Sequence, residues 1–184
     1  MKKYNLRPPL TNETIELLRS GDKIVLSGEI YTARDAAHSK MANLLLGKKD
    51  LPFDPKGQVI YYVGPTPAKP GQVIGSAGPT TSGRMDAYTT SLLEAGLKGM
   101  IGKGARSESI RRAIQKHKAV YFAALGGAAV LMAKCIKQVE VIAYPELGTE
   151  AIRKLTVVDM PLIVINDSLG NDLYELGQLY YQKL

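Results

Sequence analysis

The chain has 184 residues, 45% of them hydrophobic, which is the size and apolar content of one domain with a substantial core. Its net charge of +7 is compatible with a negatively charged partner, such as a nucleic acid, an anionic membrane surface or an acidic small molecule, but the basic residues are spread along the chain and a solvated surface explains most of them. A single cysteine, Cys135, excludes an internal disulfide and an iron–sulfur cluster held by this chain alone.

The first ten residues carry Lys2, Lys3 and Arg7 and lack the apolar core of a signal peptide. No apolar run in the sequence approaches the length that is needed to span a membrane. We therefore expect the protein to be cytoplasmic.

The first part of the chain is expected to contain three helices and three strands. The spacing of Ala37, Met41 and Leu44 predicts a helix over 34–46, which Gly47 ends. The other elements follow from similar patterns: a helix over 12–19 ended by Gly21, strands over 23–31, 59–63 and 97–101, and a helix over 85–94 ended by Gly96.

The second part continues with a helix over 107–117, for which Ser107 is the candidate cap, and a strand over 120–124. Gly126 and Gly127 are expected to open an Ala-rich helix that runs to 136, and a strand follows over 139–143. Segments 161–165 and 172–175 are predicted to pair as a hairpin across the turn at 168–171.

These elements indicate the fold class. Strands and helices mix without strict alternation, and the segment 119–124 is apolar enough to be buried on both faces of a sheet. No linker or low-complexity stretch divides the chain. We therefore predict a single α/β domain over 1–184 with a mixed sheet.

The most informative segment is Gly75-Ser-Ala-Gly-Pro-Thr-Thr-Ser-Gly-Arg-Met-Asp86, which is too rich in Gly, Ser and Thr for the interior of a helix or strand. Three glycines are expected to permit backbone angles that other residues resist: Gly75, Gly78 and Gly83. The hydroxyls of Thr80 and Thr81, with the guanidinium of Arg84 close behind, suit the binding of one anion. We interpret this loop as an anion or substrate site.

Three cationic residues follow predicted strands or stand beside glycines: Arg34, Arg84 and Lys103. Loops at strand ends are where α/β sheets usually gather a site. Each residue alone would fit a surface salt bridge, but their shared placement favours a pocket for a small molecule with two carboxylates.

The remaining candidates are weaker. His38 shares a helix face with Arg34 and could belong to the site, pair with Asp35 or lie at the edge of the core. No histidines and carboxylates have metal-ligand spacing, so no metal site is predicted. The run 102–104 lacks the rest of a phosphate-binding P-loop, and no nucleophile elbow supports a Ser-His-Asp triad.

Six motifs stand in order along nearly the whole chain: Tyr31-Thr-Ala-Arg-Asp-Ala-Ala-His38, the Gly75–Asp86 loop, Gly99-Met-Ile-Gly-Lys-Gly104, Tyr121-Phe-Ala-Ala-Leu-Gly-Gly-Ala-Ala129, Glu140-Val-Ile-Ala-Tyr-Pro-Glu-Leu-Gly148 and Gly170-Asn-Asp-Leu-Tyr174. Together they resemble the β subunit, or C-terminal domain, of iron–sulfur class I fumarases and L-tartrate dehydratases. The Gly-Pro-Thr-Thr-Ser-Gly-Arg-Met-Asp run is the most specific of them.

The resemblance implies a swivelling β/β/α domain and a hydro-lyase of the fumarate hydratase type, which serves the tricarboxylic acid cycle and is active only as a hetero-oligomer. In that family a 4Fe-4S cluster lies on the α subunit, bound by three cysteines of that subunit, and its unliganded iron binds the substrate's hydroxyl and a carboxylate. The single Cys135 fits a chain that supplies the other half of the site.

Carried over by motif, Arg34, Arg84 and Lys103 would bind substrate carboxylates. Thr80 would be the base at the carbon that loses its proton, with Thr81 beside it. A threonine hydroxyl is a poor base, so a nearby arginine must favour its alkoxide. No residue here is evident as the acid for the leaving hydroxyl, and we expect it on the partner.

Two alternatives stay open. The motifs fit L-tartrate dehydratase as well as fumarate hydratase, because tartrate differs from malate by one hydroxyl. A basic anion-binding or nucleic-acid-binding module without catalysis is the alternative of another class. That alternative predicts aromatics among the basic residues, and the basic segment 106–118 has none.

Overall fold

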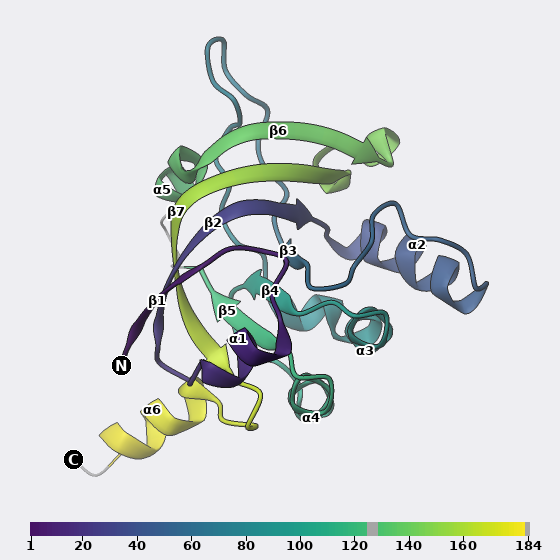
Figure 1. The fold of residues 1–184 in the computed structure, drawn as a ribbon. Coiled ribbons are helices and arrows are strands. Elements are labelled where there is room, and N and C mark those ends of the chain that lie inside the picture. Colours follow the sequence, from purple (N-terminus) through teal and green to yellow (C-terminus); the bar gives the residue numbers. More distant parts are fainter. Residues whose placement is uncertain (125–128, 183–184) are drawn as a thin grey trace.

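The computed structural model describes residues 1–124 and 129–182. Within them the chain forms one seven-stranded mixed sheet with helices against it (Figure 1). The strands are β1 (Lys3–Leu6), β2 (Lys23–Thr32), β3 (Val59–Tyr61), β4 (Gly99–Gly102), β5 (Val120–Ala123), β6 (Ile136–Ala143) and β7 (Ile152–Asn166). The helices are α1 (Asn12–Leu17), α2 (Asp35–Leu46), α3 (Asp86–Glu94), α4 (Glu108–Lys116), α5 (Ala129–Cys135) and α6 (Leu173–Tyr181), with 3₁₀ helices η1 (Ser82–Met85) and η2 (Pro145–Glu150).

The sheet closes on itself. Its order is β1-β2-β3-β4-β5-β7-β6, and the long strand β7 also pairs antiparallel with β2, from Lys23 opposite Ile163 to Thr32 opposite Arg153. Strands β2, β3, β4, β5 and β7 therefore form a barrel-like ring, and β1 and β6 lie outside it. This confirms the prediction of an α/β fold with a mixed sheet.

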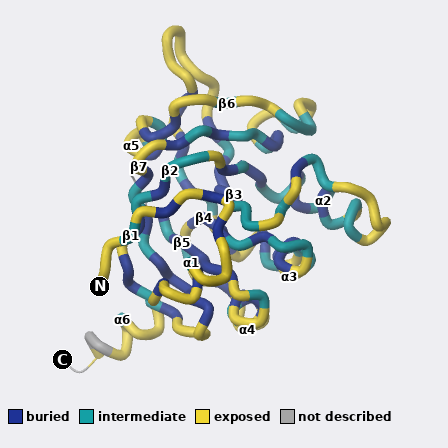
Figure 2. Tube along the Cα trace, viewed as in Figure 1, coloured by how far each residue is buried: buried dark blue, intermediate teal, exposed yellow. Residues whose placement is uncertain are grey.

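The central strands are buried on both faces, as predicted for the segment at 119–124. Val59 and Tyr61 of β3 belong to an apolar cluster that includes Leu155 of β7, inside the ring. The alternate residues Ile60 and Tyr62 belong to a second cluster, which α2, α3 and α4 complete on the outer face. Figure 2 shows the resulting centre of buried residues, with the exposed residues at the helix surfaces and in the loops.

The structure corrects the prediction of a hairpin near the C-terminus. Asp172 caps α6, since its side chain accepts a hydrogen bond from the backbone N–H of Tyr174 at 2.8 Å. Residues 173–175 are therefore helical, and only an isolated bridge joins Asn166 to Asp172. Strand β1 and the first part of β7 were not predicted. The expected helix start at Gly126 and Gly127 lies outside the described residues.

The parallel strands β2, β3 and β4 bring three loops to one edge of the sheet, because the carboxyl ends of neighbouring parallel strands coincide. After β3 the chain makes a long arm whose residues 66–73 are all exposed and which projects beyond the sheet (Figures 1 and 2). It then returns to the edge at the Thr80 loop. None of the helices described is long and apolar enough to cross a membrane.

Candidate active site

The loop with the two threonines is inserted between the ends of β3 and β4. The backbone N–H of Thr80 donates to the carbonyl of Tyr62 at 2.7 Å, and the N–H of Lys103 donates to the carbonyl of Thr80 at 3.2 Å. The N–H of Ser82 then donates to the carbonyl of Lys103 at 2.9 Å, and Thr81 forms a parallel bridge with Lys103. The loop thus extends the sheet, and its backbone is fixed beside that of Lys103.

Ser82 anchors this loop in the core. Its side chain is fully buried and lies 2.9 Å from the hydroxyl of Tyr121, which itself donates to the carbonyl of Gly104 at 2.8 Å. Ser82 must therefore be the donor to Tyr121. A Cβ atom at position 102 would lie 1.9 Å from Ser82 Oγ, so Gly102 makes room for the anchor.

The prediction that three glycines supply unusual backbone angles to the loop is wrong. Gly75, Gly78 and Gly83 are absent from the positive-φ residues of the structure. Gly75 is instead a site of close approach, because a Cβ there would lie 2.3 Å from the carbonyl oxygen of Thr66 across the arm. A Cβ at Gly83 would make only an ordinary contact, 3.6 Å from a backbone oxygen.

The two predicted arginines lie on either side of one carboxylate. Arg34 immediately precedes α2 and Arg84 lies in η1. Asp35 Oδ1 accepts a hydrogen bond from Arg84 Nε at 2.8 Å, and its Oδ2 is 3.6 Å from Arg34 Nη2. The sheet edge therefore holds Arg34 and Arg84 joined through Asp35, and Thr80, Thr81 and Lys103 joined through backbone pairing.

His38 is a core residue that faces the backbone of Arg34. It is fully buried, and its Nδ1 lies 2.9 Å from the carbonyl oxygen of Arg34. A carbonyl only accepts, so Nδ1 carries the proton. Burial lowers the pKa of His38 to about 4, and the ring is neutral at pH 7. His38 supports the turn that carries Arg34 and is not paired with Asp35.

Sequence reasoning missed a buried charge next to the site. Arg106 has a fully buried side chain, and its Nε donates to Asp86 Oδ1 at 2.7 Å. Its guanidinium also lies over the rings of Tyr62 and Tyr121, at 5.5 and 5.3 Å. The acidic residue that ends the Thr80 motif is therefore the partner of a structural arginine, and no signal in the sequence distinguished Arg106 from the exposed basic residues of α4.

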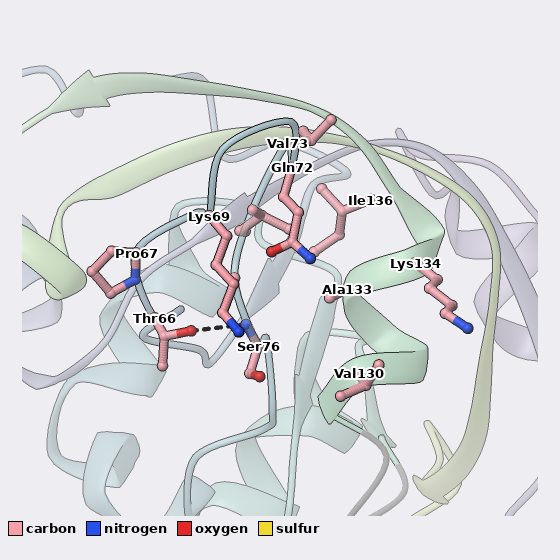
Figure 3. Close-up of a pocket in the computed structure, with 12 residues that line it drawn as sticks. Thr66, Pro67, Lys69, Gln72, Val73, Ser76, Val130, Ala133, Lys134 and Ile136 are labelled. Carbon is pink, nitrogen blue, oxygen red and sulfur yellow. Dashed lines mark hydrogen bonds between the residues drawn. The ribbon is translucent and has the colours of Figure 1, made fainter.

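A cavity of about 380 Å³ lies elsewhere, between the arm and α5 (Figure 3). Its walls include Thr66, Val73, Val130 and Ile136, and Thr66 Oγ1 accepts a hydrogen bond from the N–H of Ser76 at 2.8 Å. The predicted site residues do not line it. They lie at the carboxyl ends of β2, β3 and β4, outside this cavity.

The cysteine of this chain does not fit an iron–sulfur cluster. Cys135 lies against β7, with its Sγ 3.7 Å from the carbonyl oxygen of Asp159, and burial raises the pKa of its thiol. Among residues 1–124 and 129–182, no three His, Cys, Asp or Glu side chains gather as metal ligands. The described residues therefore do not supply the set of thiolate ligands that an iron–sulfur cluster needs.

Comparison with known proteins shows that this chain is similar to fumarate hydratases and to a subunit of a tartrate dehydratase. The protein family described as Fumarase C-terminus matches residues 1–177. Fumarate hydratase class I, anaerobic, from Escherichia coli is 43% identical over 83% of this chain, and Fumarate hydratase 2 from Leishmania major is 38% identical over 94%. A putative L(+)-tartrate dehydratase subunit beta from Methanocaldococcus jannaschii is 38% identical over 95%.

These relatives differ in length. The chain spans 28% of the Escherichia coli protein and 31% of the Leishmania protein, but 93% of the Methanocaldococcus protein. The similarity to the two fumarate hydratases therefore concerns less than a third of each.

Proposed function

Since the chain belongs to the Fumarase C-terminus family, we propose that it is the β-subunit half of an iron–sulfur hydro-lyase that hydrates fumarate reversibly to malate. The observation that carries the proposal is the gathering of Arg34, the Thr80 loop and Lys103 at the carboxyl ends of β2, β3 and β4. The cluster and the acid for the leaving hydroxyl belong to a partner chain in this proposal.

The cations supply binding and charge stabilisation. Arg34, Arg84 and Lys103 hold the two carboxylates of the substrate, the arginines through pairs of N–H donors and the lysine as a point charge. Removal of a proton beside a carboxylate develops negative charge, and fixed cations at that position lower the barrier.

Thr80 is the proposed base and Thr81 its neighbour. The backbone N–H and carbonyl of Thr80 form hydrogen bonds with Tyr62 and Lys103, respectively. The hydroxyl is therefore attached to a part of the loop whose backbone is fixed. Thr80 is half-buried and Thr81 is exposed. Neighbouring cations favour the alkoxide over its hydroxyl, and they must outweigh the burial, which disfavours the charged form.

A second candidate function is dehydration of L-tartrate. The Methanocaldococcus relative named for that activity matches this chain over almost its whole length. The same cations would bind tartrate, which has two carboxylates, as malate does. The distinction then rests on groups that hydrogen-bond the additional hydroxyl.

The test is assembly with a cluster-bearing partner, followed by anaerobic assays on fumarate and L-tartrate. We expect the assembled protein to be active. This chain alone should be inactive, because it has one cysteine and cannot hold the cluster by itself. Turnover of fumarate by the purified chain without a partner would contradict the half-site proposal. Higher kcat/KM on L-tartrate than on fumarate would select the second candidate.

A conservative change at Arg84 tests the binding role. Arg84→Lys keeps the charge but loses the planar fork, so we expect KM to rise about five- to tenfold, the equivalent of one lost hydrogen bond. Steady-state kinetics of the assembled protein measure it. Unchanged KM and kcat would show that Arg84 is only a surface residue, in keeping with its half-exposed side chain.

A further inference from the structure

Asp35 is the residue that connects the two proposed substrate-binding arginines. It accepts a hydrogen bond from Arg84 Nε at 2.8 Å and lies 3.6 Å from Arg34 Nη2. The contact uses only Nε of Arg84, which leaves the edge formed by its two terminal nitrogens for a carboxylate of another molecule. Arg84 is otherwise half-exposed in η1, so this contact fixes the direction of its side chain.

Arg34 has a second acidic contact, with Glu150 of η2. Glu150 Oε1 is 3.4 Å from Arg34 Nη2, while Oε2 accepts a hydrogen bond from the N–H of Ala36 at 2.9 Å. That N–H belongs to the first turn of α2, where backbone donors have no partner within the helix. Glu150 therefore holds the start of α2 and the guanidinium of Arg34 together.

The arm supplies the space for this guanidinium. A Cβ atom at Gly64 would lie 2.7 Å from Arg34 Nη1 and 3.1 Å from its Cδ. The side chain of Arg34 is thus bounded by Gly64 on one side and by Asp35 and Glu150 on the other. It has little freedom to turn.

We propose that Asp35 is a positioning residue that orients Arg84 and Arg34 toward the two carboxylates of one dicarboxylate substrate. The inference rests on the proposed function, which places the substrate at this edge. A negative charge among the cations opposes anion binding, so Asp35 favours binding only if the orientation of the donors outweighs this repulsion. The two effects predict opposite changes in affinity, and this makes the proposal testable.

The experiment compares Asp35→Asn with the unmodified chain, each assembled with its cluster-bearing partner. It measures kcat and KM for fumarate and L-tartrate, and the Kd of succinate, an unreactive dicarboxylate, by calorimetry. We expect KM and the succinate Kd to rise about two- to fivefold, because ion pairs that are partly exposed contribute up to about 1 kcal/mol. The change in kcat should be smaller.

Glu146→Gln is the matched control. Glu146 pairs with Lys40 at 2.6 Å on the surface of α2 and contacts neither arginine. The same loss of one negative charge there should leave KM and the succinate Kd unchanged. An equal rise in both variants would show an effect that does not depend on the contacts of Asp35 with the arginines, and it would overturn the proposal.

A double variant separates positioning from a general loss of structure. If Asp35 acts through Arg84, Asp35→Asn added to Arg84→Lys should raise KM by less than the product of the two single effects. Multiplicative effects, or a lower KM in Asp35→Asn alone, would overturn the proposal. Should Asp35→Asn fail to fold, Asp35→Glu decides, since it keeps the charge but shifts the carboxylate by one methylene relative to Arg84 Nε; unchanged KM and succinate Kd in that variant would overturn the proposal.

Failure of the proposed function and failure of the proposed role of Asp35 give different results. Activity with an unchanged KM in Asp35→Asn would leave the proposed function standing and remove the role of Asp35. Binding of succinate without turnover of either substrate would remove the proposed function, and the succinate Kd of the variants would still decide the role of Asp35. Absence of both binding and turnover would overturn both.

Discussion

Replacing Thr80 by valine is expected to lower the turnover of the assembled enzyme by about 10²–10⁴-fold, the usual contribution of a general base. Valine keeps the β-branched shape and removes the oxygen that accepts the proton. The loop itself should persist, because the bonds that hold it to Tyr62 and Lys103 are made by the backbone. KM should change less, since Arg34, Arg84 and Lys103 remain.

Thr81→Val is the control for this experiment. Thr81 is exposed and lies in the same short bridge to Lys103, so the change perturbs the same loop with the same chemistry. It should cost less turnover than Thr80→Val. Loss of turnover in Thr81→Val with near-normal Thr80→Val would move the role to Thr81. Normal turnover in both would place the base on the partner chain.

The gathering of Arg34 and Lys103 could be predicted from the sequence because it follows a rule of sheet geometry. Arg34 and Lys103 come directly after strands, and parallel neighbouring strands end at one edge. That the Thr80 loop reaches this edge depends on its pairing with Tyr62 and Lys103. The contact between Asp35 and Arg84 joins residues far apart in the sequence, and no local pattern indicates it.

The elements that sequence reasoning missed lack a clean pattern. The first part of β7 reads Ile152-Arg-Lys-Leu-Thr-Val-Val-Asp-Met160, with charged residues among the apolar ones. It is nevertheless a strand, because it pairs with β2 on one side and β6 on the other. The edge strand β1 is only four residues long. Tertiary pairing decides both.

The burial of Arg106 likewise could not be predicted from the sequence. In the sequence it stands at the start of a basic segment, which favours an exposed side chain. Its burial depends on contacts with Tyr62, Tyr121 and Asp86, which lie just after β3, in β5 and at the start of α3. Only the assembled sheet creates this environment.

Asp86→Ala is expected to lower the free energy of unfolding by about 3–5 kcal/mol, the usual cost of leaving a buried charge without its partner. Arg106 would keep a hydrogen bond from Nη2 to Thr89 Oγ1 at 2.7 Å, but this partner is neutral. The N–H of Ser107, which donates to Asp86 Oδ2 at 2.8 Å, would also lose its acceptor. Chemical denaturation of the purified protein measures the change.

Glu108→Ala is the matched control, since Glu108 pairs with Arg112 on the exposed face of α4. Removing that exposed carboxylate should cost about 0.5 kcal/mol or less. A double variant tests the cause directly. If the uncompensated charge of Arg106 dominates, adding Arg106→Met to Asp86→Ala should recover part of the loss, because methionine is apolar and fits a buried site. A further drop in stability would show instead that the packing of the guanidinium against Tyr62 and Tyr121 matters more than its charge.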